Sequence, residues 1–175
     1  MEEQARVEEV VKVSGIENKY LSFHLADELY GLDILKVREI IGIQEVTKVP
    51  GAEAYLIGVI NLRGKVIPVA DLRLRFALPV REYDARTCII VVEITGEAGP
   101  VAMGIVVDAV DAVVNLRDEQ IEKTPVFSSA VSRDCIKGLG KFEDKVVILL
   151  NIDQVCSDDR IKEESSDEVA ADGVS

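Results

Sequence analysis

The chain has few of the residues on which many catalytic sites depend. Its 175 residues include no tryptophan, one histidine and three cysteines, and aromatic residues make up only 5% of the total. His24 lies in an alternating stretch, residues 21–25, where a solvent-facing or cross-strand position is expected rather than a role as general base. Cys88, Cys135 and Cys156 form no CxxC pair, so we predict buried free thiols in place of a disulfide framework or a zinc site.

Motifs for nucleotide and metal binding are also missing. The sequence has no GxxxxGK[ST] loop, and the GLG at 138–140 lacks the third glycine of a dinucleotide-binding turn. The acidic pairs Asp108/Asp111 and Asp158/Asp159 have no further oxygen ligands at set spacing around them. We therefore expect no catalysis, no cofactor and no bound metal.

Long apolar runs are absent as well. No window approaches the roughly 20 apolar residues that a membrane-spanning helix requires. The first residues, MEEQARVEEV, are acidic where a secretory signal peptide would be basic. The sequence therefore predicts a cytoplasmic protein that does not insert into a membrane.

Net positive charge is lacking, since the formal charge is −12. Residues 1–18 and 157–175 together carry −8 of it, and the acidic C-terminal run is predicted to be disordered because it has few large apolar groups to bury. Such a balance disfavours nucleic-acid binding, which needs clustered cations. One arginine cluster is interleaved with Glu82 and Asp84 and favours a solvated face or a rim for an acidic protein partner: Arg73, Arg75, Arg81 and Arg86.

The apolar residues that are present fall into short runs typical of β-strands. The most informative segment, IGVINLRGKVIPVADL at 57–72, reads as strand, turn, strand, with the turn over Arg63-Gly64-Lys65. Two exposed cations at the tip of a turn are candidates for contact with a binding partner. Strands are predicted at 19–26, 29–35, 38–43, 56–62, 65–70, 87–95, 101–107, 109–115, 134–140 and 145–150. Short helices are predicted at 71–76, 118–122 and 151–156.

The second half of the chain repeats the first. Gly58 and Lys65 match Gly138 and Lys145 at an offset of 80, and residues 30–37 match 103–110 at an offset of 73. Chance similarity between apolar strands is the alternative, but the glycine, lysine and cap positions agree as well as the hydrophobic ones. The repeat predicts a mainly β fold of two five-stranded modules, at about 19–80 and 81–156.

Four strings carry a resemblance to a known family: DILKVREI at 33–40, GVINLRGKVIPVADLR at 58–73, MGIVVDAV at 103–110 and GLG at 138–140. Together they resemble CheW, the coupling protein of bacterial chemotaxis, over roughly residues 19–156. The resemblance implies two SH3-like barrels around a shared apolar core. It also implies a non-catalytic adaptor, monomeric in isolation, that joins chemoreceptor tips to the regulatory domain of a CheA-type histidine kinase in membrane-associated arrays. The alternatives are an SH3-like module for another signalling kinase or for nucleic acid.

Candidate contact residues follow from this resemblance and from strand alternation. A groove between two barrels suits a helical receptor tip, with apolar walls and charged groups that fix register. The receptor candidates are Val37, Glu39, Arg63 and Val113; Glu39 and Arg63 are expected to pair when free, and the two valines have plain core packing as the alternative. The kinase candidates are Leu32, Ile34, Ile41 and Ile43. Four glycines are interpreted as backbone requirements of turns and close packing: Gly58, Gly64, Gly104 and Gly138.

Overall fold

The fold is described from a computed structural model, which covers residues 18–123 and 133–156. The predicted acidic tail at 157–175 and residues 1–17 of the N-terminal extension lie outside the described residues. The strands are β1 (Lys19–Leu25), β2 (Glu28–Asp33), β3 (Val37–Gly42), β4 (Leu56–Leu62), β5 (Lys65–Asp71), β6 (Cys88–Gly96), β7 (Gly99–Val107), β8 (Ala109–Asn115), β9 (Ile121–Glu122), β10 (Ile136–Phe142) and β11 (Lys145–Leu150). The short helical elements are η1 (Ile34–Lys36), α2 (Leu72–Arg75), η2 (Asp118–Gln120), η3 (Arg133–Cys135) and α3 (Ile152–Cys156).

The ten predicted strands are confirmed, with ends within two residues of those observed. The helix predicted at 118–122 is corrected: only Asp118–Gln120 forms a single 3₁₀ turn, and Ile121–Glu122 then pairs with β10 as the short strand β9. Backbone groups at the edge of β10 are satisfied by this pairing, which competes with continuation of the helix.

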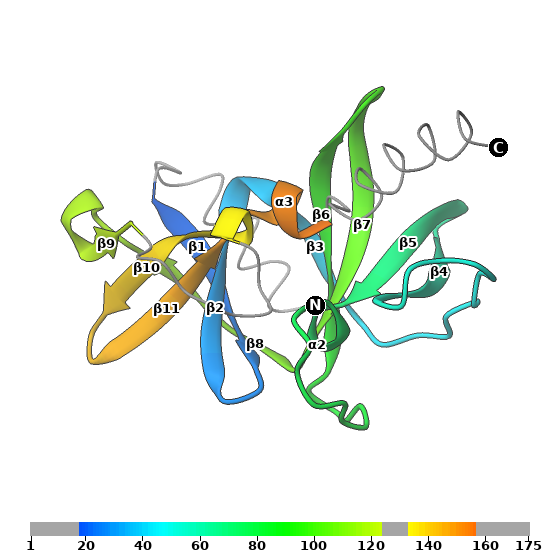
Figure 1. The fold of residues 1–175 in the computed structure, drawn as a ribbon, viewed down its shortest axis with the longest axis horizontal. Helices are drawn as coiled ribbons and strands as arrows, with labels where there is room; N and C mark the ends of the chain where they lie inside the picture. Colours follow the sequence, from blue (N-terminus) through cyan, green and yellow to red (C-terminus); the bar gives the residue numbers. More distant parts are fainter. Residues whose placement is uncertain (1–17, 124–132, 157–175) are drawn as a thin grey trace, which may run out of the picture.

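The strands form two sheets that exchange elements between the halves of the chain. Sheet A has the order β8-β1-β2-β11-β10-β9, and sheet B has the order β3-β6-β7-β5-β4 (Figure 1). Each sheet is thus a five-stranded SH3-like unit, with β9 as a short addition to sheet A. The predicted division into 19–80 and 81–156 is corrected, because each sheet joins the first hairpin of one half to the last three main strands of the other. The exchange arises because the chain passes through the shared core at η1, where Ile34 is buried.

The internal repeat is visible in the strand register. Leu149 of β11 pairs in parallel with Gly31 of β2, and Val69 of β5 pairs in the same way with Gly104 of β7. The edge strands follow the repeat too. The pairing of β3 with β6 shifts register at Arg38, and the pairing of β8 with β1 shifts at Asp111, which is 73 residues later. Two copies of one strand pattern therefore build the molecule.

Buried residues form three clusters. One lies within sheet B and includes Ile60 and Val69, one lies within sheet A and includes Leu116 and Leu149, and the largest is shared between the two sheets. The helices α2 and α3 contribute to the shared core, with Leu72 from α2 and Ile152 and Val155 from α3, and Phe76 joins it directly after α2.

The four predicted structural glycines divide into one turn and three close approaches. Gly64 lies in the two-residue turn between β4 and β5, where Arg63 has φ 51° and Gly64 has φ 88°, values that suit a type I′ hairpin. Lys65 already belongs to β5. Gly58, Gly104 and Gly138 lie inside strands, and a Cβ at these positions would come within 3.0 Å of a neighbouring atom.

Candidate functional site

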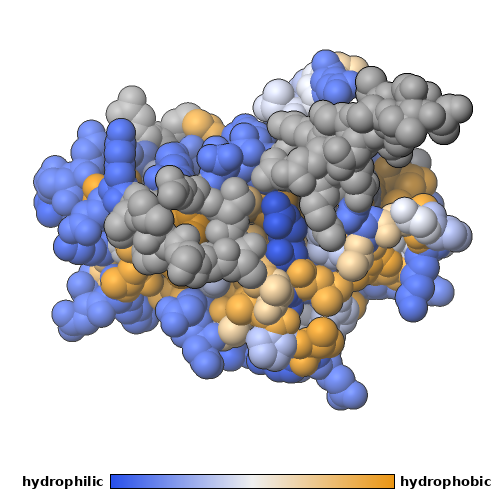
Figure 2. Space-filling model, in the orientation of Figure 1, coloured by the Kyte–Doolittle hydropathy of each residue, from blue (hydrophilic) through white to orange (hydrophobic). Residues whose placement is uncertain are grey.

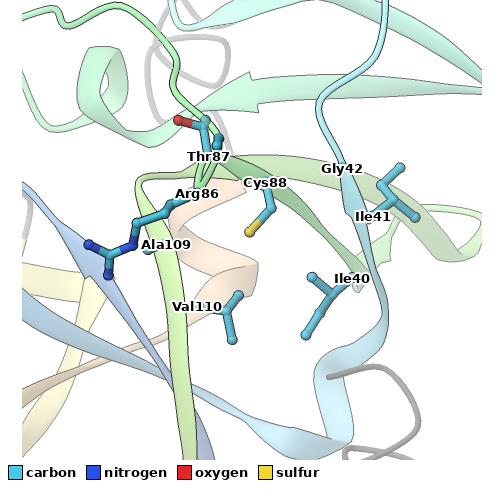
Figure 3. Close-up of a pocket in the computed structure, with 9 residues that line it drawn as sticks. Ile40, Ile41, Gly42, Arg86, Thr87, Cys88, Ala109 and Val110 are labelled. Atoms are coloured by element: carbon cyan, nitrogen blue, oxygen red, sulfur yellow. The ribbon is translucent and has the colours of Figure 1, made fainter. Parts of the chain in front are cut away.

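A cleft lies between the open edges of the two sheets. β3 is the edge strand of sheet B and β8 is an edge strand of sheet A. The cleft has a volume of about 390 Å³, and its lining comes from the end of β3, the start of β8 and the segment that enters β6 (Figure 3). Its lining residues are Ile40, Ile41, Gly42, Ala85, Arg86, Thr87, Cys88, Ala109 and Val110. Residues from both sheets therefore meet at one accessible place, where polar groups contribute more of the exposed lining than apolar ones.

The predicted receptor valines lie on the same two strands as this cleft. Val37 begins β3 and Val113 lies in the second half of β8, and both are partly buried against the shared core. The repeat relates Val37 to Val110 and Ile40 to Val113, each at an offset of 73. The two valines are therefore the repeat counterparts of two residues that line the cleft, and they continue its apolar character along the edge strands.

The charged candidates Glu39 and Arg63 form an ion pair, as predicted. Nη1 of Arg63 donates a hydrogen bond of 3.1 Å to Oε1 of Glu39, and Nη2 contacts the other carboxylate oxygen. The hydrogen bond to Glu39 raises the pKa of Arg63 above its usual value. The Glu39 side chain is only 11% exposed whereas that of Arg63 is 69% exposed, so the cation remains open to a partner. The pair borders a separate cavity of about 210 Å³ at sheet B.

The residues at the register shifts of the two edge strands also carry ion pairs. Arg38 contacts Glu93 on β6, and Asp111 lies 3.5 Å from Nε2 of His24 on β1. These contacts occupy repeat-related positions. His24 therefore has a cross-strand position, as the alternation predicted.

The predicted kinase residues fall into two groups. Leu32 and Ile34 are 0% and 1% exposed in the shared core, which corrects their assignment to a contact surface. β2 is an interior strand of sheet A, so its apolar face is already covered. Ile41 is partly buried and lines the cleft, whereas Ile43 is 36% exposed just beyond β3. Only these last two side chains are placed to reach a partner.

A buried ion pair beside the cleft was missed by the sequence analysis. Arg73 donates to Asp108 through Nε at 2.9 Å and through Nη2 at 2.6 Å, and the backbone N–H of Ala26 donates to the same carboxylate at 2.8 Å. Burial alone would raise the pKa of Asp108, but these hydrogen bonds outweigh it and the pKa lies below its usual value. The pair joins α2 to the bend between β7 and β8 and to the β1–β2 turn.

Most arginines of the predicted cluster interact with other groups within the protein. Arg73 is held by Asp108, Arg75 donates to the carbonyl of Val155 at 2.9 Å, and Arg81 lies 3.4 Å from Asp84. Arg86 is exposed, and its side chain makes no ion pair with any other residue in 18–123 or 133–156.

Neither a metal-binding cluster nor a membrane-spanning helix is present in residues 18–123 and 133–156. No group of three or more His, Cys, Asp or Glu side chains is arranged to hold a metal ion there. None of the helices in these residues has both the length and the apolar content needed to cross a membrane.

Comparison with known proteins gives consistent matches. A model of the CheW-like domain matches residues 19–160. The chain is 37% identical over 154 residues to a chemotaxis protein CheW of Klebsiella aerogenes, a match that covers 87% of this chain and 90% of that protein. It is 28% identical to a chemotaxis protein CheW of Thermotoga maritima, over 84% and 93% of the two chains. The solved structure of the scaffolding protein TtCheW from Thermoanaerobacter tengcongensis matches with a TM-score of 0.73 and 36% identity, over 81% of this chain and 94% of that one.

Proposed function

The chain belongs to the CheW-like family, and we propose from this that it bridges chemoreceptor cytoplasmic tips and the regulatory domain of a CheA-type histidine kinase. At the coarser level, it is a non-catalytic adaptor of chemotaxis signalling. The proposal adds the two partners, and with them recruitment to receptor arrays at the membrane.

The cleft between β3 and β8 is the observation that carries the receptor part of the proposal. Its lining takes residues from both sheets, among them Ile40, Ile41 and Val110, and the partly buried Val37 and Val113 lie farther along the same edge strands. A helical hairpin presents two apolar stripes side by side, which suits a groove with two equivalent walls. The Glu39–Arg63 pair lies on β3 and on the adjacent turn, where Arg63 is free to exchange Glu39 for a receptor carboxylate.

The kinase part of the proposal rests on the exposed apolar residues at the β3 and β4 edges of sheet B. Ile43 is 36% exposed and Val49 is 46% exposed. Both belong to the 43–55 segment, which is tied to β4 by two backbone hydrogen bonds of 2.8 Å between Thr47 and Val59. Exposed apolar side chains on this one segment could be covered by a second barrel of similar fold.

Replacing Val110 by arginine is expected to abolish receptor binding and to leave kinase binding intact. Val110 is half-buried in the cleft, so an arginine there fills the space of the docked helix and adds a charge that the apolar surface does not solvate. We would titrate the protein by calorimetry with a chemoreceptor tip fragment and, separately, with a kinase regulatory domain from the same organism. We expect at least about a hundredfold loss for the receptor, the size of effect seen at interface hot spots.

Val146→Arg is the matched control, because Val146 is a 53% exposed strand valine on the β10–β11 hairpin of sheet A, away from the cleft lining. It should bind the receptor fragment as the wild type does. Wild-type protein that binds neither partner at high concentration would contradict the proposed function. A Val110→Arg variant that is folded and still binds the receptor would move the receptor surface away from the cleft.

A further inference from the structure

The apolar residues along the cleft between β3 and β8 do not distinguish the two opposite directions in which a helical hairpin could lie in it. The repeat exchanges Ile40 with Val113 and Val110 with Val37, so the groove presents nearly the same contacts when its two ends are interchanged. An antiparallel helical hairpin has approximate two-fold symmetry of its own. A charged group present at one end only is therefore needed to fix orientation.

Arg86 is such a group. It lines the cleft together with Ile40 and Val110, and Figure 3 shows its side chain extending past Ala109, on the side away from Ile40 and Ile41. It is exposed and has no ion-pair partner among the described residues, in contrast to Arg73 and Arg81. A cation covered by a docked partner interacts more strongly with a carboxylate than one surrounded by water, because the local dielectric constant is lower.

The backbone around Arg86 is held in place. Asp84 Oδ1 accepts hydrogen bonds from the backbone N–H of Arg86 at 2.8 Å and of Thr87 at 3.2 Å, and the Thr87 hydroxyl donates to the same oxygen at 3.3 Å. The hydrogen bond from Arg86 and the others keep the pKa of Asp84 below its usual value, so this carboxylate remains charged at neutral pH. Thr87 is itself buried. The guanidinium therefore extends from a fixed point at the rim.

We propose that Arg86 selects an acidic side chain on the docked receptor hairpin and so sets the direction in which the hairpin lies in the groove. The inference rests on the proposed function and names the chemistry of the partner at that site. The partner segment that fits this site is a helix with an apolar stripe. Its carboxylate is at the end of the helix that lies beside residues 85–88.

Charge reversal at Arg86 tests the inference. The receptor tip fragment would be titrated at several salt concentrations with wild type, Arg86→Glu, Arg86→Lys and the control Arg117→Glu, which alters an exposed arginine directly before η2. We expect Arg86→Glu to bind about tenfold more weakly with a smaller salt dependence, Arg86→Lys to bind within about threefold of wild type, and Arg117→Glu to match it. Thermal unfolding would verify that each variant is folded.

Rescue identifies the acidic partner. Receptor fragments with single Asp or Glu residues changed to Lys should include one that binds Arg86→Glu better than it binds wild type. If wild type binds and Arg86→Glu binds equally well, the inference is overturned while the proposed function stands. If wild type does not bind the fragment at all, both fail together.

Discussion

Replacing Asp108 by alanine is expected to destabilise the protein by about 3–5 kcal/mol, the usual effect of breaking a buried ion pair from one side. Both side chains of the Arg73–Asp108 pair are 11% exposed. Without Asp108, the guanidinium stays in a site that water scarcely reaches, and the backbone N–H of Ala26 loses its acceptor. The loss should be measured as the change in the free energy of unfolding in urea.

An exposed pair of the same type provides the control. Arg117 and Glu119 are 72% and 71% exposed, and Glu119→Ala is expected to change stability by less than about 1 kcal/mol. Equal losses in the two variants would contradict the view that burial determines the cost. A loss confined to Asp108→Ala would identify the pair as the link between α2, the β1–β2 turn and the start of β8.

The same carboxylate should contribute to the dependence of stability on pH. Its pKa in the folded protein is lowered, so its contribution is fully present above the unfolded pKa of about 3.9 and is lost as the pH falls through the lower folded value. We expect the wild-type free energy of unfolding to fall as the pH is lowered below about 4, and the fall to be smaller in Asp108→Asn. Parallel curves for the two proteins would show that Asp108 does not titrate differently in the folded and unfolded states.

Sequence periodicity predicted the strands well because each run of alternating or apolar residues reflects burial of that run alone. It did not predict the exchange of strands between the two sheets. Alternation shows which side chains are buried, but the offsets of 73 and 80 are the same whether a module pairs with itself or with its copy. The partner is decided by the path of the chain at η1 and at the bend after β7, where single residues such as Ile34 and Asp108 are buried.

The same limit explains the outcome for the site residues. Leu32 and Ile34 alternate like residues of an edge strand, but Leu32 lies in β2, between β1 and β11, and Ile34 lies in η1, and both side chains are in the shared core. Glu39 and Arg63 were paired correctly because a turn tip and a nearby strand restrict where their side chains reach. The Arg73–Asp108 pair was missed because its partners are 35 positions apart on elements with no shared pattern.

Substituting alanine for Gly58 is expected to cost about 3 kcal/mol of stability, in the upper range for single substitutions that strain the backbone. Gly58 has φ 148°, which side chains rarely adopt, and a Cβ there would lie 2.2 Å from the carbonyl oxygen of Thr47. That carbonyl accepts the N–H of Val59 in the bridge that holds the 43–55 segment on β4. Relief of the clash therefore requires the segment to move away from the sheet.

Substitutions at two other glycines serve as comparisons for the loss of stability expected at Gly58. Gly138 is the repeat counterpart of Gly58, and a Cβ there would lie 2.8 Å from the carbonyl oxygen of Glu122, so Gly138→Ala should cost about 1–2 kcal/mol. Gly42 ends β3 with no atom within 4 Å of a Cβ, so Gly42→Ala should be neutral within about 0.5 kcal/mol. Equal stability of the Gly58 and Gly42 variants in urea unfolding would contradict the close approach of β4 to Thr47.

Binding separates the local effect of Gly58→Ala from general destabilisation. Because the 43–55 segment carries Ile43 and Val49, its displacement should weaken binding of the kinase regulatory domain, even at temperatures where the variant is fully folded. Gly138→Ala acts on β9 in the other sheet and should leave that affinity unchanged. If both variants lose kinase affinity to the same degree, the contact surface does not depend on the position of the 43–55 segment, and the kinase face must lie elsewhere on the molecule.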